Sequence, residues 1–286
     1  LLYGLMLKSG NDTAVALAEY AGDSIQGFAE LMNKKASELN LNNTHFETPH
    51  GLDADNHYTT AYELALLSNY ALKNKTFSQI VGTKTYTVTI NGYPKTISNT
   101  NELLGNLNGV YGIKTGFTNG ANRCLVTACK RDNMDIICVV LGADTKKYRT
   151  QDSIKLINYT FNNFKPVNIE ELINNKFEEW KKENLNSFSI NKGLSQNINL
   201  YIEEINKPII PIKKDLVNSI NISINCNKIF EAPLIQNTCI GNIDITISNN
   251  LTLTYNIYTS KTIARKSWIT YFTSILKNYS IILETL

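Results

Sequence analysis

Three strand patterns follow one another in the middle of the chain with no helical pattern between them. Alternating apolar and polar residues predict strands over Tyr111–Thr118, Cys124–Lys130 and Asp135–Leu141, separated by short turns. Short turns join antiparallel neighbours, because two parallel strands need a long crossover connection. The middle of the chain is therefore expected to form an antiparallel meander.

Helical patterns stand on both sides of this meander. Before it, an Ala-rich segment over 12–21, apolar residues at helical spacing over 24–41 and a capping box that starts at Thr60 predict helices. After it, residues 146–163 return to a helical pattern. Helices gathered around an antiparallel sheet indicate an α+β fold.

The second half of the chain is expected to form a separate β-rich domain. Residues 164–186 predict a linker helix, and short alternating runs punctuated by Asn, Pro and Gly predict a small β-sandwich over 187–262. Residues 263–286 predict an amphipathic C-terminal helix with aromatic side chains on one stripe. Such a helix is a candidate for attachment to a membrane surface, although packing on its own domain fits the same pattern.

Composition narrows the classes of function. The 286 residues include 28 basic and 25 acidic side chains, a formal charge of +3 without a block of like charge. This balance argues against a nucleic-acid partner. Five cysteines without Cys-x-x-Cys spacing indicate neither a disulfide framework nor a zinc module. The sequence has no apolar run of about twenty residues, so it predicts no ordinary transmembrane helix.

Two short strings carry the candidate chemistry. In Lys114-Thr115-Gly116, within the first strand of the meander, an ammonium, a hydroxyl and a position without a side chain can dock a peptide that ends in a carboxylate. Ser9-Gly10-Asn11 stands directly before the Ala-rich helix. Each string alone is typical of ordinary structure, an edge strand and a helix cap. Their order relative to the helix and the sheet resembles the layout of the penicillin-recognising serine hydrolases, and this resemblance implies that they form one site.

Three histidines and one arginine suggest other chemistry. His45, His50 and His57 share a loop with two aspartates, and zinc sites combine such ligands. The loop has no helix-borne His-x-x-x-His pair, so we expect no metal or other cofactor and interpret Pro49-His50-Gly51 as a structural loop near the site. Arg123 is either an attractant for a substrate carboxylate or a solvated turn residue, and the sequence favours the second interpretation.

The motifs resemble those of the penicillin-recognising serine hydrolases. More specifically, the chain is similar to the D-alanyl-D-alanine carboxypeptidases, the low-molecular-mass penicillin-binding proteins, over nearly all of residues 1–163. Four segments carry the similarity: Leu1–Asp12, Phe46–Asp53, Asn99–Asn101 and Gly112–Thr118. The resemblance implies a peptidase domain over 1–163 with a β-lactamase-like antiparallel sheet flanked by helices. Residues 230–265 resemble the β-rich C-terminal domain of the family more weakly.

The resemblance also implies an activity and residue roles. Family members remove the terminal D-Ala from peptidoglycan stem peptides through an acyl-serine intermediate, and β-lactam antibiotics acylate the same serine. Ser9 would relay protons near the leaving amine, and Asn11 would orient the substrate amide and the base. Lys114 and Thr115 would bind the substrate carboxylate, and Lys114 would also tune proton transfer. The backbone N–H of Phe117 would donate to the oxyanion.

One family motif is not in its expected place. The family carries its nucleophile and base in a Ser-x-x-Lys string on a helix before the second motif, but here Leu1 stands directly before that motif. Two such strings, Ser189–Lys192 and Ser274–Lys277, occur only after Lys114, and we expect neither to serve. The chain is therefore expected to be an N-terminally incomplete peptidase, inactive alone, from the outer face of the bacterial cytoplasmic membrane. A non-catalytic peptidoglycan-binding module and a β-lactamase are the alternatives.

Overall fold

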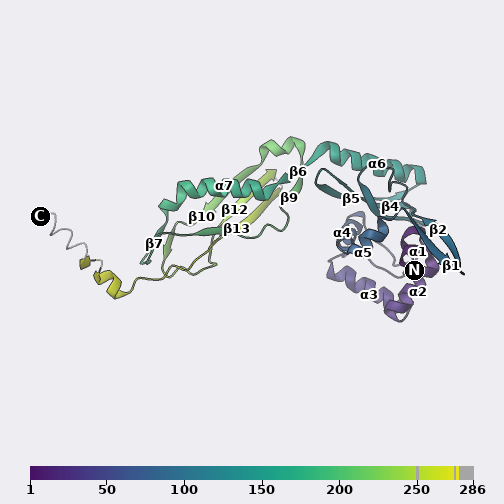
Figure 1. Cartoon of the computed structure of the whole chain (residues 1–286), viewed down its shortest axis with the longest axis horizontal. Coiled ribbons are helices and arrows are strands. Elements are labelled where there is room, and N and C mark those ends of the chain that lie inside the picture. The colour runs from purple at the N-terminus through teal and green to yellow at the C-terminus, as the bar shows by residue number, and fades with distance from the viewer. Residues whose placement is uncertain (249–250, 274, 277–286) are drawn as a thin grey trace. The chain divides into compact units, whose positions relative to one another are not determined.

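The computed structural model describes residues 1–248, 251–273 and 275–276. It divides the chain into two compact units, Leu1–Asn163 and Phe164–Leu286 (Figure 1). Different groups of buried apolar residues form the cores of the two units, so each unit is described by itself.

The first unit contains all the predicted motifs. Its helices are α1 (Leu2–Lys8), α2 (Asn11–Gly22), α3 (Ile25–Glu38), α4 (Ala61–Leu72), α5 (Lys75–Val81) and α6 (Lys146–Asn163). Its strands are β1 (Thr85–Ile90), β2 (Tyr93–Ser98), β3 (Val110–Thr118), β4 (Asn122–Arg131) and β5 (Met134–Ala143).

The sheet order β3-β4-β5, antiparallel throughout, confirms the predicted meander. The register places Lys114 opposite Val126 and Phe117 opposite Arg123. The turn between β3 and β4 ends at Asn122, whose φ of 55° lies in the left-handed region. Asparagine adopts this conformation more readily than most residues with a side chain, so the tight connection forms without glycine at this position.

Helices cover both faces of this sheet (Figure 1). Leu125 and Cys129 of β4 share a buried cluster with Ile157 of α6. On the other face Ala128 shares a cluster with Val81 of α5. Odd and even positions of β4 enter different clusters because successive side chains of a strand point to opposite faces. The result is an α+β arrangement, as the order of the patterns predicts.

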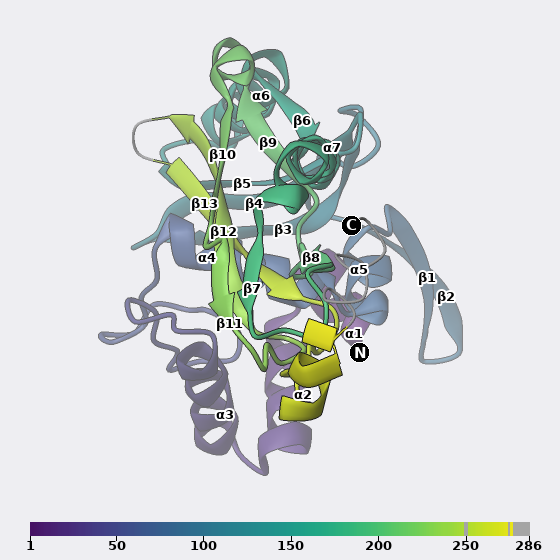
Figure 2. The same ribbon diagram turned by 90° about the vertical axis from the view of Figure 1, so that its left-hand side faces the viewer.

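A hairpin and a short helix complete the first unit. Strands β1 and β2 form an antiparallel hairpin that projects away from α5 (Figure 2). Ile97 at its base is buried with Ile80 of α5 and Leu7 of α1. Leu7 therefore anchors α1 through its last turn, and this contact sets the position of Ser9, the next residue but one.

The second unit is rich in β-structure. Its strands are β6 (Phe164–Asn168), β7 (Ser189–Asn191), β8 (Leu200–Ile202), β9 (Ile209–Lys213), β10 (Asn221–Cys226), β11 (Ile229–Glu231), β12 (Cys239–Ser248) and β13 (Leu251–Thr259). One sheet has the order β10-β12-β13-β8, while β6 pairs with β9 and β7 with β11. The unit also contains the α-helix α7 (Ile169–Asn184) and the 3-10 helices Leu185–Ser187 and Lys214–Ser219.

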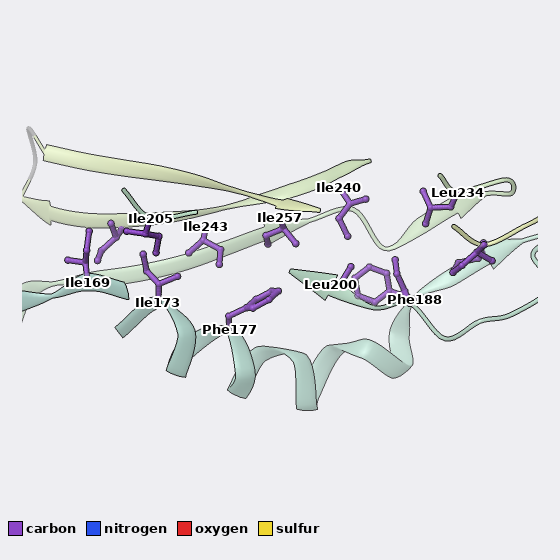
Figure 3. Close-up of a cluster of buried hydrophobic side chains, with 14 of the residues drawn as sticks. Ile169, Ile173, Phe177, Phe188, Leu200, Ile205, Leu234, Ile240, Ile243 and Ile257 are labelled. Atoms are coloured by element: carbon purple, nitrogen blue, oxygen red, sulfur yellow. The ribbon is translucent and has the colours of Figure 1, made fainter. Parts of the chain in front are cut away.

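The segment 164–186, expected to be a linker helix, differs from that expectation. Its first residues form strand β6, and α7 belongs to the core of the second unit. Figure 3 shows Ile173 and Phe177 of α7 pointing toward Ile243 and Ile257 of the sheet. The apolar stripe that identifies the helix is buried against strands, so the helix is a core element and not a free connection.

The predicted C-terminal helix over 263–286 lies partly outside the described residues. Within the described part, residues 268–273 are helical, and Trp268 and Phe272 are exposed. No helix among the described residues is long and apolar enough to cross a bilayer.

Candidate active site

A cleft of about 770 Å³ opens in the first unit. Its walls come from the α1–α2 junction, the loop around His50, the segment before β3, the second half of β3 and the start of α6. All six residues to which the sequence assigns a role line it: Ser9, Asn11, Lys114, Thr115, Gly116 and Phe117. Segments more than a hundred residues apart in the chain thus share one cavity.

Ser9 occupies an uncommon backbone conformation at the end of α1. Its φ of 61° and ψ of 43° are left-handed, and its N–H donates to Leu5 O at 2.9 Å. The N–H of Gly10 closes the same turn on Gly4 O at 3.3 Å. A left-handed residue with a side chain is unusual at a helix end, where glycine is the common choice. The turn lets Asn11 begin α2 directly, so that both side chains line the cleft.

Lys114 makes the contact that joins the two motifs. Its Nζ donates to Ser9 Oγ at 2.9 Å and to the backbone carbonyl of Thr115 at 2.9 Å. Burial, with a smaller contribution from the charge of Arg149, lowers the pKa of Lys114 to about 8. The amine is therefore about nine-tenths protonated at pH 7 and acts there mainly as a positively charged donor.

Thr115 is oriented by a segment that precedes β3. Its hydroxyl donates to Thr100 Oγ1 at 2.7 Å. The residues on either side of Thr100 are fastened to the backbone: Asn99 Nδ2 donates to the carbonyls of Val81 and Thr83, and Asn101 Nδ2 donates to Gly112 O, each at 3.1 Å. Asn101 is 2% exposed. The two asparagines thus hold Thr100 against Thr115.

The start of α6 adds a cationic wall. Arg149 is 4% exposed, and its Nη2 lies 2.6 and 2.7 Å from the two carboxylate oxygens of Glu102. Lys146 Nζ approaches the same carboxylate at 4.0 Å, and Thr150 donates a hydrogen bond to it. Burial raises the pKa of Glu102, but the hydrogen bonds from Thr150 and Arg149 outweigh burial and hold the pKa below its usual range.

The loop around His50 is fastened to the tip of the β3–β4 hairpin. Asp53 Oδ2 accepts a hydrogen bond from the N–H of Gly120 at 3.0 Å. The hydroxyl of Thr118 and this N–H lower the pKa of Asp53. The contact positions the adjacent residues 49–52, which form one wall of the cleft.

The ring nitrogens of the three histidines form hydrogen bonds with backbone groups of the same loop. His57 Nδ1 accepts from the N–H of Glu47 at 3.1 Å, and His50 Nδ1 accepts from the N–H of Leu52 at 3.2 Å. His45 Nδ1 donates to Asn56 O at 2.6 Å. Within the described ranges, no group of three or more His, Cys, Asp or Glu side chains is placed to hold a metal ion.

Neither Ser-x-x-Lys string supplies a Ser–Lys pair within the described residues. Ser189 lies in β7 of the second unit, where Lys192 Nζ forms an ion pair with Glu231 at 2.7 Å. The amine is thus engaged by a carboxylate. Ser274 and Lys277 lie outside the described residues.

Among the lining residues that carry no role in the sequence-based prediction are Thr100, Glu102, Lys146 and Arg149. Thr100 lies in the Asn99–Asn101 string, which contributed to the family resemblance only. Glu102 and Arg149 stand 47 residues apart, and no local pattern connects them. Only their contact in the folded chain identifies them as part of the site.

Comparison with known proteins agrees with these motifs. Residues 1–145 match the family described as D-alanyl-D-alanine carboxypeptidase. The chain is 39% identical over 165 residues to the D-alanyl-D-alanine carboxypeptidase DacF of Bacillus subtilis, covering 57% of this chain and 42% of that protein. It is 40% identical over 173 residues to the D-alanyl-D-alanine carboxypeptidase of Streptomyces sp. strain K15, covering 56% of this chain and 60% of that protein. The chain therefore spans about two fifths to three fifths of these relatives.

Solved structures extend the likeness into the second unit. Penicillin-binding protein 5 of Haemophilus influenzae superposes with a TM-score of 0.71 at 26% identity, covering 92% of this chain and 73% of that one. The Streptomyces K15 DD-transpeptidase superposes with a TM-score of 0.54 at 37% identity, covering 56% of this chain and 65% of that one. The fold is that of the penicillin-recognising serine hydrolases, followed by a β-rich unit. With its motifs gathered in one cleft, the chain belongs to the D-alanyl-D-alanine carboxypeptidase family of serine peptidases.

Proposed function

We propose that the cleft binds peptidoglycan stem peptides that end in D-Ala-D-Ala and belongs to a serine-type carboxypeptidase that removes the terminal D-Ala. The observation that carries this proposal is the hydrogen bond from Lys114 to Ser9, beside the Thr115 hydroxyl. A charged amine and a hydroxyl in one wall suit a peptide carboxylate. The serine beside them suits proton transfer at the scissile bond.

Each residue has a role in the proposed reaction. A serine hydroxyl attacks the carbonyl between the two D-Ala residues, the C–N bond breaks, and the leaving amine takes up a proton. Ser9 relays that proton, and Asn11 orients the amide. The charge of Lys114 favours the proton transfer, and the Phe117 N–H donates to the oxyanion. Gly116 lets the peptide backbone approach β3. Water then releases the acyl group and restores the serine.

We also propose that residues 1–286 do not form the acyl-enzyme by themselves. Among the described residues that line the cleft, Ser9 is the single serine, and its hydroxyl already accepts from Lys114. The other lysine among the described lining residues, Lys146, lies beside the carboxylate of Glu102 and belongs to no Ser-x-x-Lys string. In this form the chain acts as a non-catalytic peptidoglycan-binding module, the second function that we retain.

Fluorescent penicillin tests this part of the proposal. We expect no covalent label on residues 1–286, and a label on a protein that also carries a Ser-x-x-Lys segment ahead of Leu1. A covalent adduct on residues 1–286 alone would contradict the assignment of the motifs. Rapid turnover of penicillin by the longer protein would favour the β-lactamase alternative.

Peptide binding tests the recognition itself. Acetylated peptides that end in D-Ala-D-Ala and in L-Ala-L-Ala are titrated against residues 1–286 in a 15N NMR experiment. We expect tighter binding of the D-Ala-D-Ala peptide, with shifted signals at Ser9, Asn11 and Thr115. Equal binding of both peptides would remove the stereochemical basis of the proposed function.

The location of the protein is part of the same proposal. Its substrate lies outside the cytoplasmic membrane, so we propose an extracytoplasmic site of action on the outer face of that membrane. Arg265 and Lys266 precede exposed Trp268, Phe272 and Ile275, a composition that suits contact with a membrane surface. Binding of residues 1–286 to anionic vesicles, compared with Trp268→Ser, measures that contact.

A further inference from the structure

Arg123 is a cation in the cleft with no acidic partner among the described residues. It lies at the start of β4 and lines the cavity together with Phe117, its neighbour across the strands. Its Cζ lies 3.6 Å from the centre of the Phe117 ring, so the guanidinium stacks on that ring. Among the described residues, no carboxylate lies within ion-pair distance of Arg123. Its charge in this wall is thus unpaired.

Arg131, at the other end of β4, shows what a structural arginine does in the same setting. Its Cζ also stacks on an aromatic ring, that of Phe161, at 4.7 Å. Its N–H groups, however, are used within the protein: Nε donates to Asn108 O at 2.8 Å and Nη1 donates to Asn158 Oδ1 at 3.4 Å. Among the described residues, no acceptor lies within hydrogen-bond distance of the Arg123 guanidinium, so its main contact is the stack on Phe117.

Stacking fixes a guanidinium without using its donors. The contact with the ring uses the flat face of the group, and all five N–H donors lie in its plane and stay available. The exposed ring of Phe117, 52% accessible, also limits the conformations of the arginine side chain before a ligand arrives. A donor fork held in place loses less conformational entropy when it binds a carboxylate.

The charges of the lining side chains also favour an anionic ligand. Four cations line it, from Lys114, Arg123, Lys146 and Arg149, against one carboxylate, from Glu102. Glu102 is engaged by Arg149 and approached by Lys146, and Lys114 donates to Ser9. Among the described lining residues, Lys114 and Arg123 thus have no carboxylate partner, in a wall that carries excess positive charge. A ligand carboxylate would relieve this imbalance.

We propose that Arg123, held on the Phe117 ring, is a carboxylate-binding residue of the cleft. The inference rests on the proposed peptide substrate. It replaces the interpretation of Arg123 as a solvated turn residue. The carboxylate belongs either to the terminal residue of the peptide or to an acidic residue before the D-Ala pair. Both offer the same chemistry to a guanidinium fork, and the experiment separates them.

The test compares matched peptides on residues 1–286. One pair ends in D-Ala-D-Ala with a free carboxylate or a C-terminal amide, and a second pair carries glutamate or glutamine before the D-Ala residues. Dissociation constants come from 15N NMR titration of the wild type and of Arg123→Gln, with the Nε–H signal of Arg123 as a local probe. Arg131→Gln is the matched control, since it removes the same charge from the same strand outside the cleft.

We expect the wild type to prefer the anionic member of at least one pair by about fivefold. Arg123→Gln should clearly reduce that preference, with Lys114 supplying any part that remains for the terminal carboxylate, and leave binding of the neutral peptide unchanged. Arg131→Gln should preserve the preference in full. Arg123→Lys, which keeps the charge but lacks the planar fork, should restore part of it. If Arg123→Gln loses preference in the first pair, Arg123 binds the terminal carboxylate of the peptide. If it loses preference in the second pair, Arg123 binds the carboxylate of the glutamate before the D-Ala residues.

Two results would overturn the inference. One is a wild type with no preference for either anionic peptide, and the other is a preference that Arg123→Gln retains in full. The proposed function fails separately, if peptides ending in L-Ala-L-Ala bind as well as those ending in D-Ala-D-Ala. Even then, the effect of Arg123→Gln on the preference for an anionic peptide tests whether Arg123 binds a carboxylate.

Discussion

Lys114 Nζ and Ser9 Oγ lie 2.9 Å apart although 105 residues separate them in the chain. The contact joins a strand at the edge of the sheet to the end of a short helix. Burial lowers the pKa of the Lys114 ammonium to about 8. The hydroxyl of Ser9 is positioned by a left-handed backbone turn at the end of α1. A positive donor beside a fixed hydroxyl is the chemical centre of the cleft.

Binding of a peptide carboxylate should weaken as the pH rises through about 8. The pKa of Lys114 is about 8, so the amine loses its charge there, well before an exposed lysine would. Dissociation constants of an acetyl-D-Ala-D-Ala peptide between pH 6.5 and 9.5 measure the effect. Arg cannot deprotonate in this range, so Lys114→Arg is the control and should flatten the profile. An unchanged midpoint in that variant would assign the titration to another group.

Stability should rise with pH over the interval from about 8 to 10.5 because of the same side chain. The folded state holds the pKa of Lys114 at about 8, whereas the same side chain in the unfolded protein has its ordinary pKa of about 10.5. The unfolded chain therefore binds more protons in this interval, and the free energy of unfolding increases with pH. Urea unfolding of the wild type and of Lys114→Met at several pH values checks this. The rise relative to Lys114→Met should vanish below pH 8, where both states are protonated.

Replacing Glu102 with glutamine should destabilise the first unit by about 2 kcal/mol. The change removes the charge that faces Arg149, whose side chain is 4% exposed and has no other acidic partner among the described residues. The estimate is below that for a fully buried pair because Glu102 is 27% exposed. Thermal and urea unfolding measure the loss.

Glu38→Gln is the matched control for this prediction. It breaks an ion pair with Lys35 within α3, and both partners are more than two fifths exposed. We expect no measurable change in stability, because exposed pairs contribute little. Equal effects of the two substitutions would show that burial of Arg149 does not matter.

Asn101→Ala should cost about 2 kcal/mol of unfolding free energy and also weaken peptide binding. The side chain donates to Gly112 O and accepts from the N–H of Leu103, each at 3.1 Å, in a buried position. Its loss leaves both groups unpaired and releases Thr100 from the Thr115 hydroxyl. Asn163→Ala, which removes an exposed hydrogen bond to Tyr159 O at the end of α6, should change neither property.

Asp53→Ala should free the tip of the β3–β4 hairpin. The carboxylate accepts from the N–H of Gly120, so this amide should exchange with solvent about tenfold faster in the variant. Asp23→Ala, in the turn between α2 and α3, is the control and should leave this rate unchanged. A wild-type rate in Asp53→Ala would mean that the hairpin holds its shape without the loop around His50.

Local patterns determined much of this protein. The alternation of apolar and polar residues predicted the three strands of the meander, and helical spacing predicted α2, α3, α4 and α6. Two three-residue motifs, together with the segments Phe46–Asp53 and Asn99–Asn101, indicated the family, because each keeps its chemistry within a few consecutive residues. Periods of two and 3.6 residues are visible in a short window of sequence, and so are such motifs.

Only the tertiary structure decided which of these pieces meet. It brought Arg149 to Glu102 and Thr100 to Thr115, and it buried α7 in a core instead of leaving it as a linker. Such contacts depend on how distant segments pack, and packing has no period in the sequence. The sequence alone determined the family of the chain. The fold decided that burial lowers the pKa of Lys114, and that Arg123 stacks on Phe117 with no carboxylate partner among the described residues.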